Sequence, residues 1–322
     1  MDPIRMLSHS KIQYGLQWGR TSVENNILKP LKLYKRNYSY EELQKKIRQD
    51  IVDLGFEVKY SDSLIIKEKN KIVPAFIELK GSDRKNGGII KLNKKYPKNL
   101  LREALFHEYA HIKDEKLPIL TTDKNALNSK ATYEKFYMEY IEYFADMIAY
   151  TLMMPPEHMI SDLSKNAYNI NKVLKIYNNI EFSSVLQWIA LINPFPCHFV
   201  SIVYEKDDNG KDLGRVVYDN SYYDHQVDPR PFDIDATLAN KTSAAAVALE
   251  NKKPAHKASI VNGTEYYCFA YYESDLSDEV IKNTIPTLTS GHYDRLLVIG
   301  WKKDVYHAIH DEPLQMHKSS HS

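Results

Sequence analysis

Apolar positions recur with helical spacing shortly after residue 40. Leu43, Ile47 and Ile51 stand four residues apart and are followed by Val52 and Leu54, which is typical of one face of a helix. Ser39 precedes this segment, and Glu42 follows Ser39 three positions later, in the arrangement of a capping box. We therefore expect an amphipathic helix that begins after Ser39 and stops at Gly55.

A longer helical pattern extends from about residue 132 to residue 154. Two consecutive prolines, at 155–156, prevent the helix from continuing. Its apolar face, at i, i+4, i+7, i+8, i+11 and i+15, is formed by Tyr137, Ile141, Phe144, Ala145, Ile148 and Leu152. The opposite face carries carboxylates, so this helix can present acidic side chains to a neighbouring element.

Short runs rich in β-branched and aromatic residues predict strands between these two helices. The runs are FEVKYSD, SLIIKE, IVPAFIELK and GGIIKLN, within residues 56–93. Pro97 and an expected N-cap at Asn99 predict a further helix, which carries LFHEYAHIKDE at 105–115. Two or three short helices are expected over 157–194.

The pattern changes in the C-terminal third of the chain. Asn209-Gly210 and Asn262-Gly263 each separate two strand-like runs, which predicts two β-hairpins. Helices over 236–251 and 278–288 and a strand over 295–301 complete an α+β arrangement. We interpret this part as a separate sensor-like or binding domain.

An α+β protein with two main domains is therefore the expected fold class. The 322 residues are 43% hydrophobic, enough for two modest cores. The expected divisions are a helical arm over 1–36, a first domain over 37–160, a helical connector with a helix-turn-helix outline over 161–196, an α+β sensor or regulatory domain over 197–312 and a disordered tail over 313–322.

Composition also bears on where the protein works. No run of eighteen apolar residues occurs, so we expect no membrane span. The N-terminal segment lacks the apolar core of a secretion signal, and two cysteines are too few for a disulfide framework. These features favour a cytoplasmic protein.

Charge is unevenly distributed along the chain. Residues 1–120 hold 24 Lys and Arg against 15 Asp and Glu, while the rest holds 19 against 27. A basic front half can steer an acidic partner or nucleic acid, although a solvated lysine-rich surface is the ordinary interpretation. The second helix of the helix-turn-helix outline, from about Ser184, contains no Lys or Arg, so we do not expect direct DNA binding.

The strongest chemical signal is the His-Glu-x-x-His sequence within 105–115. On a helix, His107 and His111 share a face and can place two imidazole nitrogens on one zinc ion. Glu108 lies beside them, where a carboxylate can act as general base toward water. The sequence therefore predicts a zinc site with Glu108 as the catalytic group.

A catalytic zinc ion needs a third protein ligand and one open position. Glu142 is the preferred candidate, and Asp146 one turn later can accept a hydrogen bond from a ligand imidazole. Glu139 lies on much the same face and is a rival ligand. The alternative is that all three are the solvent-exposed side of an amphipathic helix.

HEYAH followed by EYFADMIAYTLMMP resembles the ImmA/IrrE family of zinc metallopeptidases over residues 37–160. The matching positions in the second motif are Glu142, Ala145, Asp146, Ala149, Leu152, Met154 and Pro155. Phe144 stands where the family often has a second Glu, Ile148 stands for the usual Phe, and Tyr109-Ala110 replaces Leu-Gly. None of these departures removes a proposed ligand.

The resemblance implies a zincin-like domain with zinc held by His107, His111 and Glu142. It also implies an endopeptidase that cleaves, or triggers removal of, a helix-turn-helix repressor and so derepresses stress, phage or mobile-element genes. Some members carry a C-terminal GAF-like domain, which suggests that a small-molecule or protein signal acts at 197–312.

Two other functions remain open from the sequence. A peptidase-like protein can sequester a repressor without cutting it, but the intact Glu108 argues against this alternative. A nucleic-acid-binding protein that uses the basic front half would show strongly salt-dependent DNA affinity.

Overall fold

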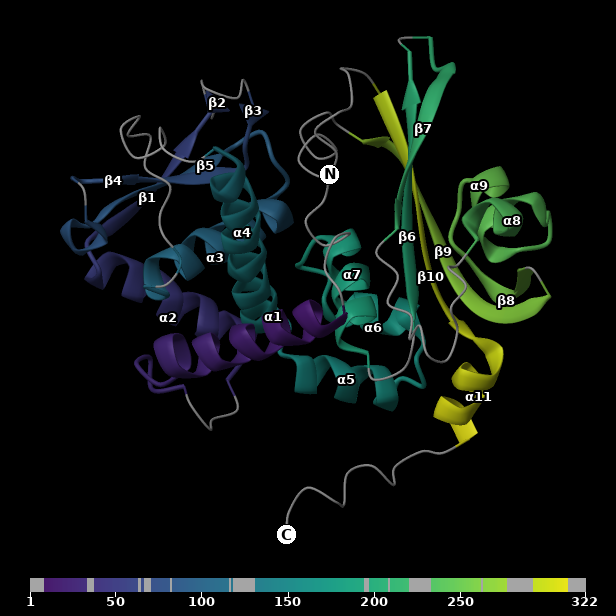
Figure 1. Cartoon of the computed structure of the whole chain (residues 1–322), viewed down its shortest axis with the longest axis horizontal. Coiled ribbons are helices and arrows are strands. Elements are labelled where there is room, and N and C mark those ends of the chain that lie inside the picture. The colour runs from purple at the N-terminus through teal and green to yellow at the C-terminus, as the bar shows by residue number, and fades with distance from the viewer. Residues whose placement is uncertain are drawn as a thin grey trace. The chain divides into compact units, whose positions relative to one another are not determined.

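The structure is a computed structural model, shown in Figure 1. Its chain divides into two compact units, which are described separately: unit 1 comprises Met1–Pro155 with Asn179–Glu181, and unit 2 comprises Pro156–Asn178 with Phe182–Ser322. The residues described are 9–33, 38–62, 65–66, 71–81, 83–115, 117, 131–193, 197–207, 209–219, 233–261, 263–276 and 292–311.

Both units combine helices with sheets, so the expected α+β class is confirmed at this level. The helical elements of unit 1 are α1 (His9–Ser22), the π-helical turn η2 (Val23–Leu28), α2 (Tyr40–Asp53), the short 3₁₀ helix η3 (Arg84–Asn86), α3 (Lys98–Lys113) and α4 (Ala131–Met153).

The start of α2 agrees with the capping prediction. The Ser39 hydroxyl accepts a hydrogen bond from the Glu42 backbone N–H at 3.1 Å. The helix stops before Gly55, whose φ of 80° lies in the left-handed region that favours glycine. Gly87 also has a positive φ, and a side chain there would collide with the Gly55 carbonyl oxygen. The two glycines therefore let the starts of neighbouring strands approach each other.

The main sheet of unit 1 has the order β1-β5-β4. Strand β5 (Gly88–Asn93) is parallel to β1 (Phe56–Ser61) and antiparallel to β4 (Ala75–Leu79). Two short strands, β2 (Ile65–Ile66) and β3 (Lys71–Ile72), form a separate pair. Strand β5 is therefore hydrogen-bonded on both sides, so Ile89–Asn93 does not form a free edge to which an extended peptide could add.

The expected N-cap at Asn99 is also wrong. Helix α3 begins at Lys98 with Pro97 in the capping position and without a side-chain cap. The cap at Pro97, with φ of −56° and ψ of 148°, lies two residues earlier than expected, so Asn99 falls within the first helical turn.

Helix α3 packs against β4, β5 and α4. It buries Leu101, Leu105, Phe106, Tyr109, Ala110 and Ile112. Helix α1 packs along α4, so the N-terminal segment that was expected to be a separate arm belongs to unit 1. Both helices that carry the predicted metal ligands are therefore held within one compact unit.

Unit 2 is built on a five-stranded antiparallel sheet with the order β7-β6-β10-β9-β8. Its strands are β6 (His198–Lys206), β7 (Asp212–Asp219), β8 (Ala255–Val261), β9 (Thr264–Leu276) and β10 (His292–Lys302). The pairs β6–β7 and β8–β9 confirm the two predicted hairpins. One sheet face forms a core with α8 (Ile234–Ala239) and α9 (Ala244–Asn251).

Two helices occupy the stretch 236–251, where a single helix was expected. The break lies between Asn240 and Ser243, where polar side chains bind nearby backbone groups. The Asn240 side chain accepts from the Thr242 N–H at 3.1 Å, and the Ser243 hydroxyl caps α9 at 3.0 Å. These local side-chain hydrogen bonds compete with the backbone hydrogen bonds of a continuous helix. Helix α11 (Lys303–Asp311) was not predicted.

Three short helices, α5 (Pro156–Lys165), α6 (Ile170–Ile176) and α7 (Phe182–Ile192), occupy most of the expected connector. They group with the sheet of unit 2 instead of standing apart. The Tyr271 hydroxyl donates to Asn171 at 2.8 Å, and buried Arg295 donates to the Ser183 hydroxyl at 3.2 Å. The expected helix 278–288 and the expected tail 313–322 lie outside the described residues.

Among the described helices, none is both long enough and apolar enough to cross a lipid bilayer.

Candidate metal centre

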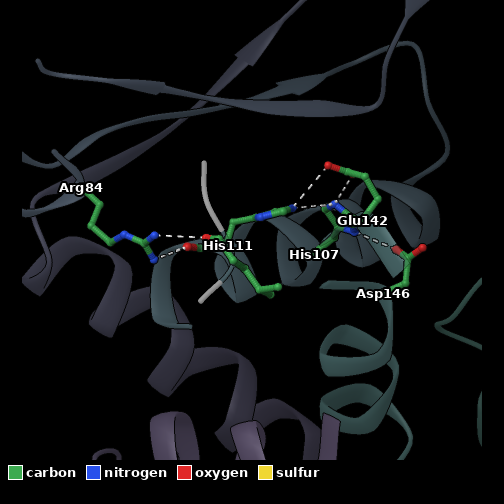
Figure 2. Close-up of polar contacts among 6 residues, drawn as sticks. Arg84, His107, His111, Glu142 and Asp146 are labelled. Carbon is green, nitrogen blue, oxygen red and sulfur yellow. Dashed lines mark hydrogen bonds and ion pairs between the residues drawn. The ribbon is translucent and has the colours of Figure 1, made fainter. Parts of the chain in front are cut away.

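The predicted histidines and one predicted carboxylate meet between α3 and α4, as Figure 2 shows. The Nε2 atom of His107 lies 3.2 Å from His111 Nε2 and 3.1 Å from Glu142 Oε2. The other oxygen, Glu142 Oε1, lies 3.8 Å from His111 Nε2. These three residues could therefore hold one metal ion.

The separations between the ligand atoms can be compared with zinc geometry. A tetrahedral ion with bonds of about 2.0–2.1 Å places its ligand atoms about 3.3 Å from one another. The observed distances of 3.1–3.8 Å bracket that value. Two imidazoles and one carboxylate also match the ligand set of catalytic zinc sites, which leave a fourth position open. The residues present therefore fit a zinc ion.

Asp146 holds the first of these imidazoles from its other side. His107 Nδ1 lies 2.7 Å from Asp146 Oδ1, a distance typical of a charge-assisted hydrogen bond. A proton kept on Nδ1 leaves the Nε2 lone pair free to point toward Glu142 and His111. Asp146 is therefore placed where the sequence expected it, behind the ligand.

The electrostatics of the metal-free site favour a positive charge. Burial opposes protonation of His107, but the carboxylates of Asp146 and Glu142 outweigh it and raise the pKa of His107 well above its usual range. A site that draws a proton onto an imidazole in this way also attracts a metal cation.

Glu108 has an unusual acidity for a carboxyl group. Burial raises its pKa to about 7, with the neighbouring Glu142 carboxylate adding to the shift and His107 opposing it. At neutral pH it is therefore poised between its two protonation states, which suits a group that must take up and release a proton.

This shift predicts a pH-dependent stability for the metal-free protein. Because the pKa of Glu108 rises from 4.5 to about 7 on folding, the folded state disfavours the ionised form, and stability falls as the pH rises from 4.5 to about 7. Glu108→Gln removes this loss. We expect its stability advantage over the wild type to grow by roughly 2 kcal/mol from pH 4.5 to 8. Urea unfolding at both pH values measures it, and a constant difference would contradict the raised pKa of Glu108.

Glu139, the rival ligand, lies on α4 in a stretch whose side chains are outside the described part of the structure. Glu142 is the described carboxylate that lies close to both imidazoles, so it is our preferred third ligand.

Arg84 supports the end of α3 and was missed by sequence reasoning. Its guanidinium donates to the carbonyl oxygens of His111 at 2.8 Å, Asp114 at 2.9 Å and Leu117 at 3.1 Å. A cation at a helix C-terminus satisfies carbonyls that lack partners within the helix. No local motif marks this role, because Arg84 is brought there from the loop between β4 and β5.

A partly buried ion pair also holds α3. Lys113 Nζ lies 2.9 Å from Asp50 Oδ2, and the Tyr109 hydroxyl donates to the same oxygen. Asp50 belongs to α2, so the helix that carries both histidines is tied to α2 as well as to the loop before β5.

Comparison with known proteins gives information on the fold alone. No family model matches the chain, and no curated protein matches it. A solved structure of a Mycobacterium tuberculosis transcriptional regulator resembles it with a TM-score of 0.53 and 9% sequence identity, covering 93% of this chain and 78% of that one. At such low identity the similarity concerns the arrangement of elements and not the chemistry of the site.

Proposed function

We propose that this chain is a zinc-dependent endopeptidase of the ImmA/IrrE type that cleaves a specific intracellular protein. The observation that carries the proposal is the convergence of His107, His111 and Glu142 next to Glu108. These are the groups that peptide hydrolysis at a metal site requires, and they come from two helices of one unit.

Each side chain has a defined part in the proposed reaction. A zinc ion bound there would acidify water and polarise the scissile carbonyl. Glu108 takes the proton from the attacking water and later delivers it to the leaving amine. Asp146 holds His107 in the orientation and tautomer that direct Nε2 toward the metal.

An outer strand of the main sheet in unit 1 would align the substrate. Since β5 is central, the outer strands of this sheet are β1 and β4. Of these, β4 contacts α3, the helix that carries both histidines. An extended peptide added to β4 would be held by main-chain hydrogen bonds near the metal centre.

The substrate class follows from the family resemblance. A helix-turn-helix repressor is the proposed target, and its cleavage would derepress stress, phage or mobile-element genes. Unit 2 is the proposed regulatory part, in which a GAF-like sheet with α8 and α9 on one face responds to a small-molecule or protein signal. Since an unregulated intracellular protease would damage its host, such control fits the proposed activity.

The test compares new protein N-termini in cells that express the wild type, Glu108→Gln or the control Glu250→Gln, at rest and under stress. Glu250 is exposed on α9 and far in sequence from the metal ligands. We expect a new N-terminus in one regulatory protein with the wild type and the control, and none with Glu108→Gln. Identical N-termini in all three strains, with zinc bound to each protein, would favour sequestration of a partner without cleavage.

A further inference from the structure

Trp18 of α1 contacts segments from both metal-binding helices. Its indole stacks on the Phe144 ring of α4, with centroids 4.9 Å apart and planes inclined by 25°. Its Nε1–H donates to Asp114 Oδ2, directly after α3, at 3.1 Å. Phe144 lies between Glu142 and Asp146 in the sequence, and Asp114 lies three residues after His111. The Trp18 side chain thus connects the end of α3, the helix of the two histidines, to α4, the helix of the carboxylates.

The Asp114 end of this link is strongly constrained. Asp114 is only 3% exposed and stands at the C-terminus of α3, where the helix dipole disfavours negative charge. Its carboxylate accepts from Trp18 and also from the Ser22 hydroxyl, at 2.7 Å. A buried carboxylate is costly unless hydrogen-bond donors surround it, so these two bonds from α1 fix the end of α3.

The α4 end is constrained by close packing of α1 against α4. Gly15 and Gly19 are four residues apart on α1 and face α4. A Cβ at Gly15 would lie 2.5 Å from the Tyr143 ring, and one at Gly19 would lie 3.0 Å from the Met147 carbonyl oxygen. The missing side chains let α1 lie directly on α4, which brings Trp18 to Phe144.

We infer that Trp18 is a positioning residue for the metal centre: it sets the spacing of α3 and α4, and so the distance of the Glu142 carboxylate from His107 and His111. The inference rests on the proposed metal site. It assigns to α1 a part in metal binding, although the three proposed ligands all come from α3 and α4.

The test uses the purified 322-residue chain with Co²⁺ as the probe, and circular dichroism first establishes which variants are folded. Trp18→Leu removes both the stacking and the hydrogen bond, and Trp18→Phe keeps a ring for Phe144. Gln17→Ala, at an exposed neighbouring position on α1, is the matched control. The readouts are the Co²⁺ dissociation constant and the visible absorption bands, which report coordination geometry.

We expect Trp18→Leu to weaken Co²⁺ binding about 10-fold and to alter the bands, as seen when groups that orient metal ligands are lost. The Co²⁺ affinity of Trp18→Phe should lie between those of Trp18→Leu and the wild type. Gln17→Ala should bind Co²⁺ with wild-type affinity and an unchanged spectrum. If Trp18→Leu does not fold, the double variant Trp18→Phe with Ser22→Ala, which removes the two α1 donors to Asp114, is expected to show the weaker Co²⁺ binding.

Wild-type affinity and an unchanged spectrum in the folded Trp18 variants would overturn the inference, because a residue that only stabilises the fold lowers the melting temperature without changing the ligand geometry. If the wild type itself binds no Co²⁺, the proposed metal centre and the proposed function are both wrong. The two failures are therefore distinguishable.

Discussion

Glu142→Ala is expected to weaken zinc binding by more than about 100-fold, because loss of a direct ligand should exceed the 10–100-fold effect of residues that only orient ligands. The reason is geometric: Glu142 is the described carboxylate whose two oxygens lie near both imidazoles, at 3.1 Å and 3.8 Å. Without it, two histidines remain to hold the ion. Competition with a chromophoric chelator measures the change.

Two further variants make this result specific. Asp146→Asn should weaken zinc binding about 10-fold, because it leaves every ligand in place and only loosens the orientation of His107. Glu250→Gln should bind zinc like the wild type. If Glu142→Ala keeps wild-type affinity while Glu139→Ala loses it, the third ligand is Glu139 and the role assigned to Glu142 is wrong.

Glu108→Gln is expected to slow hydrolysis strongly while the metal stays bound. General base catalysis contributes about 10²–10⁴-fold, so the single-turnover rate on the cleaved partner should fall by about 100- to 10,000-fold. Glutamine has a similar shape, and Glu108 is not among the three proposed ligands, so zinc affinity should change by less than about threefold.

The pH profile adds an independent readout for Glu108. The wild-type rate should rise with pH as Glu108 loses its proton. The midpoint should lie below about 7, because a bound cation favours the ionised carboxylate over its state in the metal-free protein. Cleavage by Glu108→Gln at the wild-type rate would exclude Glu108 as the base. Loss of the metal ion from Glu108→Gln would instead show that this substitution damages the metal site.

Local sequence signals were sufficient where local chemistry decides the structure. Ser39 and Glu42 mark the start of α2, since the capping bond spans only three residues. The Asn-Gly pairs mark the two hairpins of unit 2, since the strands that they join are neighbours in the sequence. The single helix expected over 236–251 shows the limit, because the caps at Asn240 and Ser243 divide an otherwise helical composition.

The sequence by itself determined which residues can bind a metal here, because the four-residue spacing of His107 and His111 places both on one helix face wherever that helix lies. Only the tertiary structure decided which carboxylate lies near them, that β5 is a central strand, and that Arg84 and Trp18 support the helices of the site. Those contacts join residues 27 to 126 positions apart, and no local pattern encodes them, because they depend on how separate elements pack.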